Sequence, residues 1–196
     1  MTPPIPSLPR RARVAALLLT GLALAACQVA GSARQAPVLG GAVTMGLPAG
    51  YCIDRSTSRE GADSAVIIMG RCNSDASAVP AIVTATVGRP GSAGVMTASP
   101  AELAAFFATT EGRATLSRDG KARDVRLISA VTSGNALLLH LVDRKQGEYW
   151  RAFVGARGRL VSISASGTPG IPLAPEAGRQ VLDAFVAALA TANATR

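Results

Sequence analysis

The chain contains one histidine, His140, which is the first residue to consider for catalysis. An imidazole can act as the general base for a serine nucleophile when a carboxylate orients it. His140 lies in the apolar run LLLHLV at 137–142, a pattern typical of a buried strand. It would share a strand face with Leu138 and Val142, whereas Asp143 would point to the other face. Because no G-x-S-x-G motif supplies a nucleophile, we interpret His140 as a packed or rim side chain and keep a hydrolase using His140 as the less favoured alternative.

A segment rich in basic residues is the second candidate site. Its basic side chains outnumber its acidic ones, and they are Arg113, Arg118, Lys121, Arg123 and Arg126. Such a segment could contact lipid headgroups or anionic cell-wall polymers. The plainer interpretation is an edge strand whose charges stay in water and oppose aggregation of the sheet.

Residues 1–26 have the three parts of an export signal. Basic residues within 10–13 precede an apolar run at 14–26, and small residues end the run. The apolar run is shorter than the roughly 20 residues that a membrane-spanning helix needs. We therefore predict that residues 1–26 are a signal peptide and that the mature protein is exported.

The end of this signal, LAAC at 24–27, resembles the lipobox of bacterial lipoproteins, Leu-(Ala/Ser)-(Gly/Ala)-Cys. The resemblance implies cleavage before Cys27, a thioether from Cys27 to diacylglycerol, and acylation of the new amino group, with palmitate as a typical acyl group. Several acyl chains hold a protein on a membrane stably, because each buried methylene contributes about 0.8 kcal/mol. Gln28 stands where the enterobacterial sorting rule places Asp in lipoproteins of the inner membrane, so the resemblance implies the periplasmic face of the outer membrane. The alternative is an ordinary signal, cut within ALA at 23–25, which would release a soluble protein.

Cys52 and Cys72 are the two other cysteines. An exported protein meets an oxidising compartment, where two cysteines make one bridge. A metal-binding or redox-active pair is the alternative, but these cysteines have neither C-x-x-C spacing nor a nearby histidine. We therefore predict a structural disulfide, Cys52–Cys72, which stabilises the fold by roughly 3 kcal/mol in the chain-entropy model.

The sequence predicts no metal site and no cofactor. Carboxylates form no acidic run of the EF-hand type, and no G-x-G-x-x-G or P-loop pattern occurs. The formal net charge of +8 does not predict nucleic-acid binding, because an exported protein is separated from nucleic acid and the sequence has no nucleic-acid recognition motif.

Apolar and β-branched runs bounded by turn residues predict the strands. Three short strands are expected at 42–47, 65–70 and 81–88. The polar stretch 54–63 is expected to form an irregular loop or a short helix. Four further strands form an antiparallel meander, at 125–131, 136–142, 148–154 and 160–165. Trp150 is interpreted as a core residue, with a ligand platform as the alternative.

Two helices are expected. Ser99 can cap the first, Pro100 suits its first position and Glu102 completes a capping box. Gly112 is expected to stop this helix. The second begins near Pro175 and carries an apolar stripe for packing on the sheet, made of Val181, Leu182, Phe185, Val186 and Leu189.

These elements define one α+β domain at 43–196, after a lipidated cysteine and flexible tether at 27–42. The domain is expected to have a mainly antiparallel sheet, with one inserted helix and one C-terminal helix packed on it, and one disulfide. The order of elements is similar to the PsbP/Mog-like fold, through LPAGY at 47–51, the helix at Ser99 and the final strand and helix within 161–189. This resemblance carries over no functional residue.

Short segments also resemble uncharacterised alphaproteobacterial envelope lipoproteins, and they are GYCID at 50–54, GRC at 70–72, AAFF at 104–107 and EGRA at 111–114. That resemblance implies no activity. The sequence as a whole favours a non-enzymatic envelope lipoprotein, an accessory or interaction module at the periplasmic membrane face. Its partner would be an envelope protein or an anionic cell-wall or lipid surface. The alternative is a lipoprotein that binds a small apolar or lipidic ligand between sheet and helix, which requires a pocket there.

Overall fold

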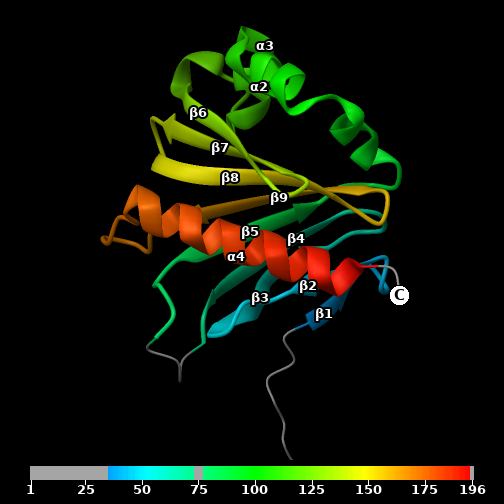
Figure 1. Ribbon diagram of the computed structural model, residues 1–196. Helices are drawn as coiled ribbons and strands as arrows, with labels where there is room; N and C mark the ends of the chain where they lie inside the picture. The colour runs from blue at the N-terminus through cyan, green and yellow to red at the C-terminus, as the bar shows by residue number, and fades with distance from the viewer. Residues whose placement is uncertain (1–34, 73–76, 195–196) are drawn as a thin grey trace, which may run out of the picture. The chain divides into compact units, whose positions relative to one another are not determined.

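The structure, a computed structural model, describes residues 35–72 and 77–194 (Figure 1). The predicted signal peptide, Cys27 and Gln28 lie outside the described residues. Within the described residues, no helix is both long enough and apolar enough to cross a membrane.

Seven antiparallel strands form the main sheet, in the order β3-β4-β5-β9-β8-β7-β6 (Figure 1). The strands are β3 (Tyr51–Glu60), β4 (Ala65–Arg71), β5 (Ile82–Val87), β6 (Val125–Ser133), β7 (Ala136–Asp143), β8 (Gly147–Ala156) and β9 (Arg159–Ser166). The predicted meander is confirmed, because β6 to β9 are consecutive in the chain and adjacent in the sheet. β5 pairs with β9, so the early strands and the meander make one continuous sheet.

β3 continues through most of the polar stretch 54–63, so the predicted loop or short helix there is wrong. A bulge follows Asp54. The Asp54 carboxylate accepts a hydrogen bond from the Ser56 backbone N–H at 2.9 Å, and the Ser58 hydroxyl accepts one from the Ile68 N–H at 2.9 Å. Polar side chains therefore bind backbone groups that the bulge leaves unpaired, which explains why a polar segment stays in the sheet.

Within the described residues the folded domain begins at Gln35, so the predicted tether at 27–42 extends too far. β1 (Gln35–Val38) and β2 (Val43–Gly46) form an antiparallel hairpin. Val38 is 1% exposed and Val43 is 0% exposed. The small residues that suggested a flexible tether instead form the hairpin turn, where Leu39 and the two following glycines adopt positive φ.

One face of the sheet is covered by α4 (Pro175–Asn193) and the β1–β2 hairpin (Figure 1). The predicted apolar stripe of α4 is confirmed, since all of its members are buried. The Phe185 ring meets the Tyr51 ring edge-on, with 5.0 Å between centroids. The Asn193 side chain donates to the Thr44 carbonyl at 2.7 Å and accepts from the Thr44 N–H at 3.0 Å, which ties the end of α4 to β2.

The opposite face carries η1 (Ser92–Thr97), α2 (Pro100–Ala108), α3 (Thr110–Leu116) and η2 (Ala122–Asp124). Along β7, Leu138 packs in the α4 cluster, whereas Leu137 and Leu139 pack with Leu103 and Phe107 of α2. Neighbouring residues of a strand point to opposite faces, so α2 and α4 lie on opposite sides of the sheet. The fold class is α+β, as predicted.

The predicted start of α2 is confirmed and its predicted stop is wrong. Ser99 Oγ accepts from the Glu102 N–H at 3.2 Å, while the Ser99 N–H donates to the Glu102 carboxylate at 2.8 Å. The helix ends at Ala108, before Gly112, and Thr109 caps α3 by accepting from the Gly112 N–H at 3.0 Å. A Cβ on Gly112 would overlap the Phe106 carbonyl, so this glycine permits close packing of the two helices.

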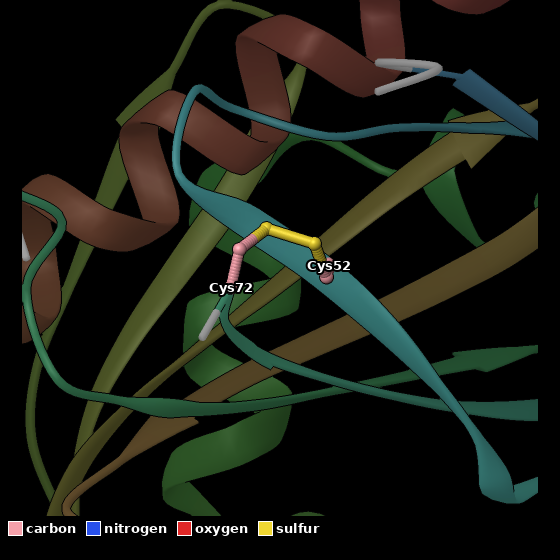
Figure 2. Close-up of a disulfide and its surroundings, with 2 residues drawn as sticks. All are labelled: Cys52 and Cys72. Carbon is pink, nitrogen blue, oxygen red and sulfur yellow. A yellow bond between two sulfur atoms is a disulfide. The ribbon is translucent and has the colours of Figure 1, made fainter. Parts of the chain in front are cut away.

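The disulfide Cys52–Cys72 is confirmed, with 5.2 Å between the Cα atoms. Cys52 lies on β3, and Cys72 follows the last residue of β4 (Figure 2). The Cys72 N–H also donates to the Gly50 carbonyl at 2.8 Å. The bridge therefore joins the start of one edge strand to the end of its neighbour.

Candidate functional site

His140 packs against an aromatic ring on the α4 side of the sheet. Its ring stacks on that of Trp150, with 4.5 Å between centroids and 3° between planes. Its Nε2 lies 2.7 Å from Glu148 Oε1 without the alignment of a directed hydrogen bond. Ser129 stands opposite His140 in the strand register, yet no hydrogen bond joins these two side chains in the described structure. The arrangement is that of a packed histidine, with Arg179 over the Trp150 ring at 5.2 Å.

The five basic residues of the predicted anionic-contact segment are not gathered into one site. Arg113 lies on α3 and Arg126 on β6, an edge strand of the sheet, and both line a shallow depression of about 260 Å³. Arg118 lines a different cavity, whereas Lys121 and Arg123 are exposed next to and within η2. The segment therefore presents dispersed charges, and only Arg118 lies at the groove described next.

A groove crosses the α2 side of the sheet, between its central strands and the helices above them. Its floor consists of side chains from β5, β9 and β8, and they are Thr84, Thr86, Ser162, Ser164, Arg151 and Phe153. η1, α2 and α3 form its roof. The groove has two halves, with cavity volumes of about 380 Å³ and 510 Å³, both within the range of small-molecule sites. Thr84, Thr115, Arg151 and Ser164 line both halves.

The first half of the groove, which we call the apolar half, is walled by aromatic and aliphatic side chains. The Phe107 ring stacks on Phe153 with 5.0 Å between centroids and meets Phe106 edge-on at 5.3 Å. Leu103 and Met96 complete the roof. Phe106 lies at the rim, where its side chain is 43% exposed.

The second half, which we call the polar half, carries charged residues of both signs. Among them, Asp119 pairs with Lys145, which lowers the pKa of the Asp119 carboxyl through a hydrogen bond and charge attraction. Asp124 Oδ1 lies 3.8 Å from a guanidinium nitrogen of Arg144. Asp143 accepts two backbone N–H bonds of the following turn, at 2.7 Å and 3.0 Å. Each carboxylate of the polar half is therefore already engaged.

Arg151 stands where the two halves meet. Its Nη1 donates to the Leu116 carbonyl at 3.3 Å, and its guanidinium carbon lies 5.4 Å from the centre of the Tyr149 ring. Its Nε is buried and finds no acceptor among the described residues. Neither Arg151 nor Arg118 forms an ion pair with any described carboxylate. Arg118 also attracts the neighbouring Asp119 carboxylate, so Arg151 is the groove cation that lacks an acidic partner among the described residues. A guanidinium suits the planar recognition of a carboxylate or phosphate.

Of the groove residues, the sequence predicts only Arg118 as a candidate site residue. One available signal was the alternation in β5 and β9. On each strand the buried face is apolar, while the other face bears hydroxyls, at Thr84 and Thr86 and at Ser162 and Ser164. A row of hydroxyls on the centre of a sheet indicates an open face. No cluster of three or more potential metal ligands occurs within 35–72 and 77–194.

No protein-family model matches the chain, and no curated protein matches it. A solved structure of a mutant of protein Mog1 is similar, with 12% sequence identity and a TM-score of 0.42, covering 81% of this chain and 93% of that one. A likeness at this level says nothing about what the chain binds.

Proposed function

We propose that this protein is a non-enzymatic binding module that holds a small apolar or amphipathic ligand in the groove, and that a lipid on Cys27 holds the module at the periplasmic face of the outer membrane. The observation that carries this proposal is the open groove between the sheet and α2, with a wall of aromatic and aliphatic side chains. An apolar cavity with a few polar groups is the usual form of a small-molecule site. His140 stacks on Trp150 and bonds to no serine among the described residues, which favours binding over hydrolysis.

The test of the groove uses N-phenyl-1-naphthylamine, an uncharged probe that fluoresces in apolar sites. The full chain would carry Cys27→Ser, so that no covalent acyl chain competes for the groove. We expect one probe molecule to bind per chain. Ser162→Trp, which places a large ring on the groove floor, should abolish binding.

Thr132→Trp is the matched control, because it adds the same ring to an exposed position of β6 away from the groove. It should bind the probe like the parent chain. Absence of probe binding, or equal binding by the Ser162→Trp variant, would overturn the proposed function.

The anchor is tested separately, by the intact mass of the protein extracted from its own envelope. The proposal expects the peptide from Cys27 onward, plus acyl chains and minus the two hydrogens of the disulfide. A bare peptide mass would remove the proposed location and leave the groove untouched.

A further inference from the structure

We propose that the groove binds a long-chain aliphatic carboxylate, with the carboxylate at Arg151 and the chain in the apolar half. This inference rests on the proposed function and names the class of its ligand. Three observations support it: the Arg151 guanidinium has no acidic partner among the described residues, hydroxyl side chains lie around it, and the apolar half of the groove begins beside it.

The charge of the groove selects the sign of the ligand. Asp119, Asp124 and Asp143 already have cationic or backbone N–H partners. Arg151 has one weak carbonyl acceptor and a buried Nε that donates to no described group. A buried donor without an acceptor is costly, and a bound carboxylate would accept from it. The ligand group that best fits beside Arg151 is therefore an anion.

The groups around Arg151 place the head of the ligand. Thr84 and Ser164 line both halves of the groove, and their hydroxyls bond to no group within the described residues. Hydroxyls can donate to a carboxylate oxygen and rotate to do so. Arg151, Thr84 and Ser164 together can thus surround one planar anionic group.

The acidic side chains of the polar half limit the charge of that head. A phosphate monoester carries up to two negative charges. The carboxylates of Asp119, Asp124 and Asp143, which line the same half, would repel such a doubly charged group. A single carboxylate needs only one guanidinium, and Arg151 offers one. The groove therefore favours a head with one negative charge.

The apolar half determines the rest of the ligand. It begins at Arg151 and Thr84 and extends beneath Leu103 and Phe107 to the exposed ring of Phe106. Its volume is about 380 Å³, and among the described residues that line it Arg151 alone is charged. A methylene chain that starts at Arg151 would bury itself there and cover the exposed rim. The ligand is a fatty acid or another molecule with one carboxylate and a long aliphatic chain.

The experiment measures displacement of N-phenyl-1-naphthylamine from the full chain carrying Cys27→Ser, by ligands with one chain length and three head groups. Dodecanoate should displace the probe at the lowest concentration, dodecanol at a higher one, and dodecylammonium at the highest. Arg151→Gln should weaken dodecanoate binding about tenfold and leave dodecanol binding unchanged. Arg126→Gln removes the same charge from the exposed surface of β6, and should change neither.

Equal displacement by the three ligands from the parent chain would overturn the inference, and this series needs no Arg151 variant to fold. An unchanged affinity of the Arg151→Gln variant for dodecanoate would overturn it as well. In both cases the probe still binds, so the proposed function would stand. Failure of the probe itself to bind is the distinct result that removes the proposed function.

Discussion

The two faces of the same sheet differ in how completely they are covered. On the α4 face, Val83 and Ile163 are 0% exposed and belong to the same buried cluster as Phe185. The next residue on each strand, Thr84 on β5 and Ser164 on β9, points to the other face and lines the groove. The difference shows that a strand alternation of apolar and hydroxyl residues supports a closed core and an open site at once. It also predicts that stability is concentrated on the α4 face and binding on the α2 face.

The largest expected effect is the loss of a ring from the closed face. Phe185→Ala should lower the free energy of unfolding by about 3–5 kcal/mol, because it leaves a cavity in a fully buried cluster. Phe107→Ala should cost less, because the Phe107 ring already borders an open groove. Urea denaturation followed by circular dichroism measures both values. Equal losses, or a larger loss at Phe107, would show that the two faces do not differ in this way.

Removal of the disulfide should have the next largest effect. Replacing Cys52 and Cys72 by alanine should lower the free energy of unfolding by roughly 3 kcal/mol, because the unfolded chain gains freedom. Neither cysteine lines the groove. The folded variant should therefore bind N-phenyl-1-naphthylamine as before, and the parent chain treated with reductant serves as the control. Weaker binding by the folded variant would mean that the bridge shapes the site.

Two glycines at close contacts allow a matched comparison. A Cβ on Gly46 would overlap the Ala188 carbonyl of α4, and a Cβ on Gly112 would overlap the Phe106 carbonyl of α2. Each substitution to alanine should cost about 1–3 kcal/mol of stability. Only Gly112→Ala displaces the roof of the groove, so it alone should weaken probe binding. A loss of probe binding in Gly46→Ala would indicate that the faces are coupled.

The smallest expected effects concern the two tyrosines. Tyr51 donates its hydroxyl to the Val79 carbonyl at 2.7 Å, whereas the Tyr149 hydroxyl has no partner among the described residues. Tyr51→Phe should therefore cost about 1 kcal/mol at pH 7, and Tyr149→Phe should cost less. Urea denaturation at pH 7 measures this pair. A larger cost at Tyr149 would mean that its hydroxyl has found a partner in solution.

The same tyrosines predict how stability depends on pH. Burial raises the pKa of both phenols in the folded protein above the unfolded value of about 10. The folded state then holds the proton more tightly, so stability is full below pH of about 10 and falls as the pH rises beyond it. Tyr149→Phe should make that fall less steep. An identical fall in the parent chain and the variant would contradict the assignment.

The fold was predictable wherever local pattern and tertiary packing agree. The capping box at Ser99, the stripe containing Phe185, the turns of the meander and the pairing of Cys52 with Cys72 all belong to this class. Each follows from spacing along the chain or, for the cysteines, from a count of two.

The remaining elements depend on contacts between distant residues. The polar strand β3 is stabilised by the hydrogen bond from the Ile68 N–H to the Ser58 hydroxyl of the neighbouring strand. β1 is stabilised by burial of Val38 in the cluster formed with α4 and β2. Gly112 is a packing residue only because Phe106 folds back onto it. The groove likewise depends on α2 and η1 crossing strands that lie far away in the sequence, such as β9. No local pattern contains that arrangement.

Binding of an aliphatic carboxylate in the groove can be observed residue by residue in the backbone amide spectrum of the ¹⁵N-labelled full chain carrying Cys27→Ser, recorded during titration with dodecanoate. We expect resonances of groove residues to move, among them those of Thr84, Arg151 and Ser162, while those of Leu182 and Leu189 on α4 stay in place. Shifts confined to α4 and the β1–β2 hairpin, or the absence of any shift, would contradict this expectation.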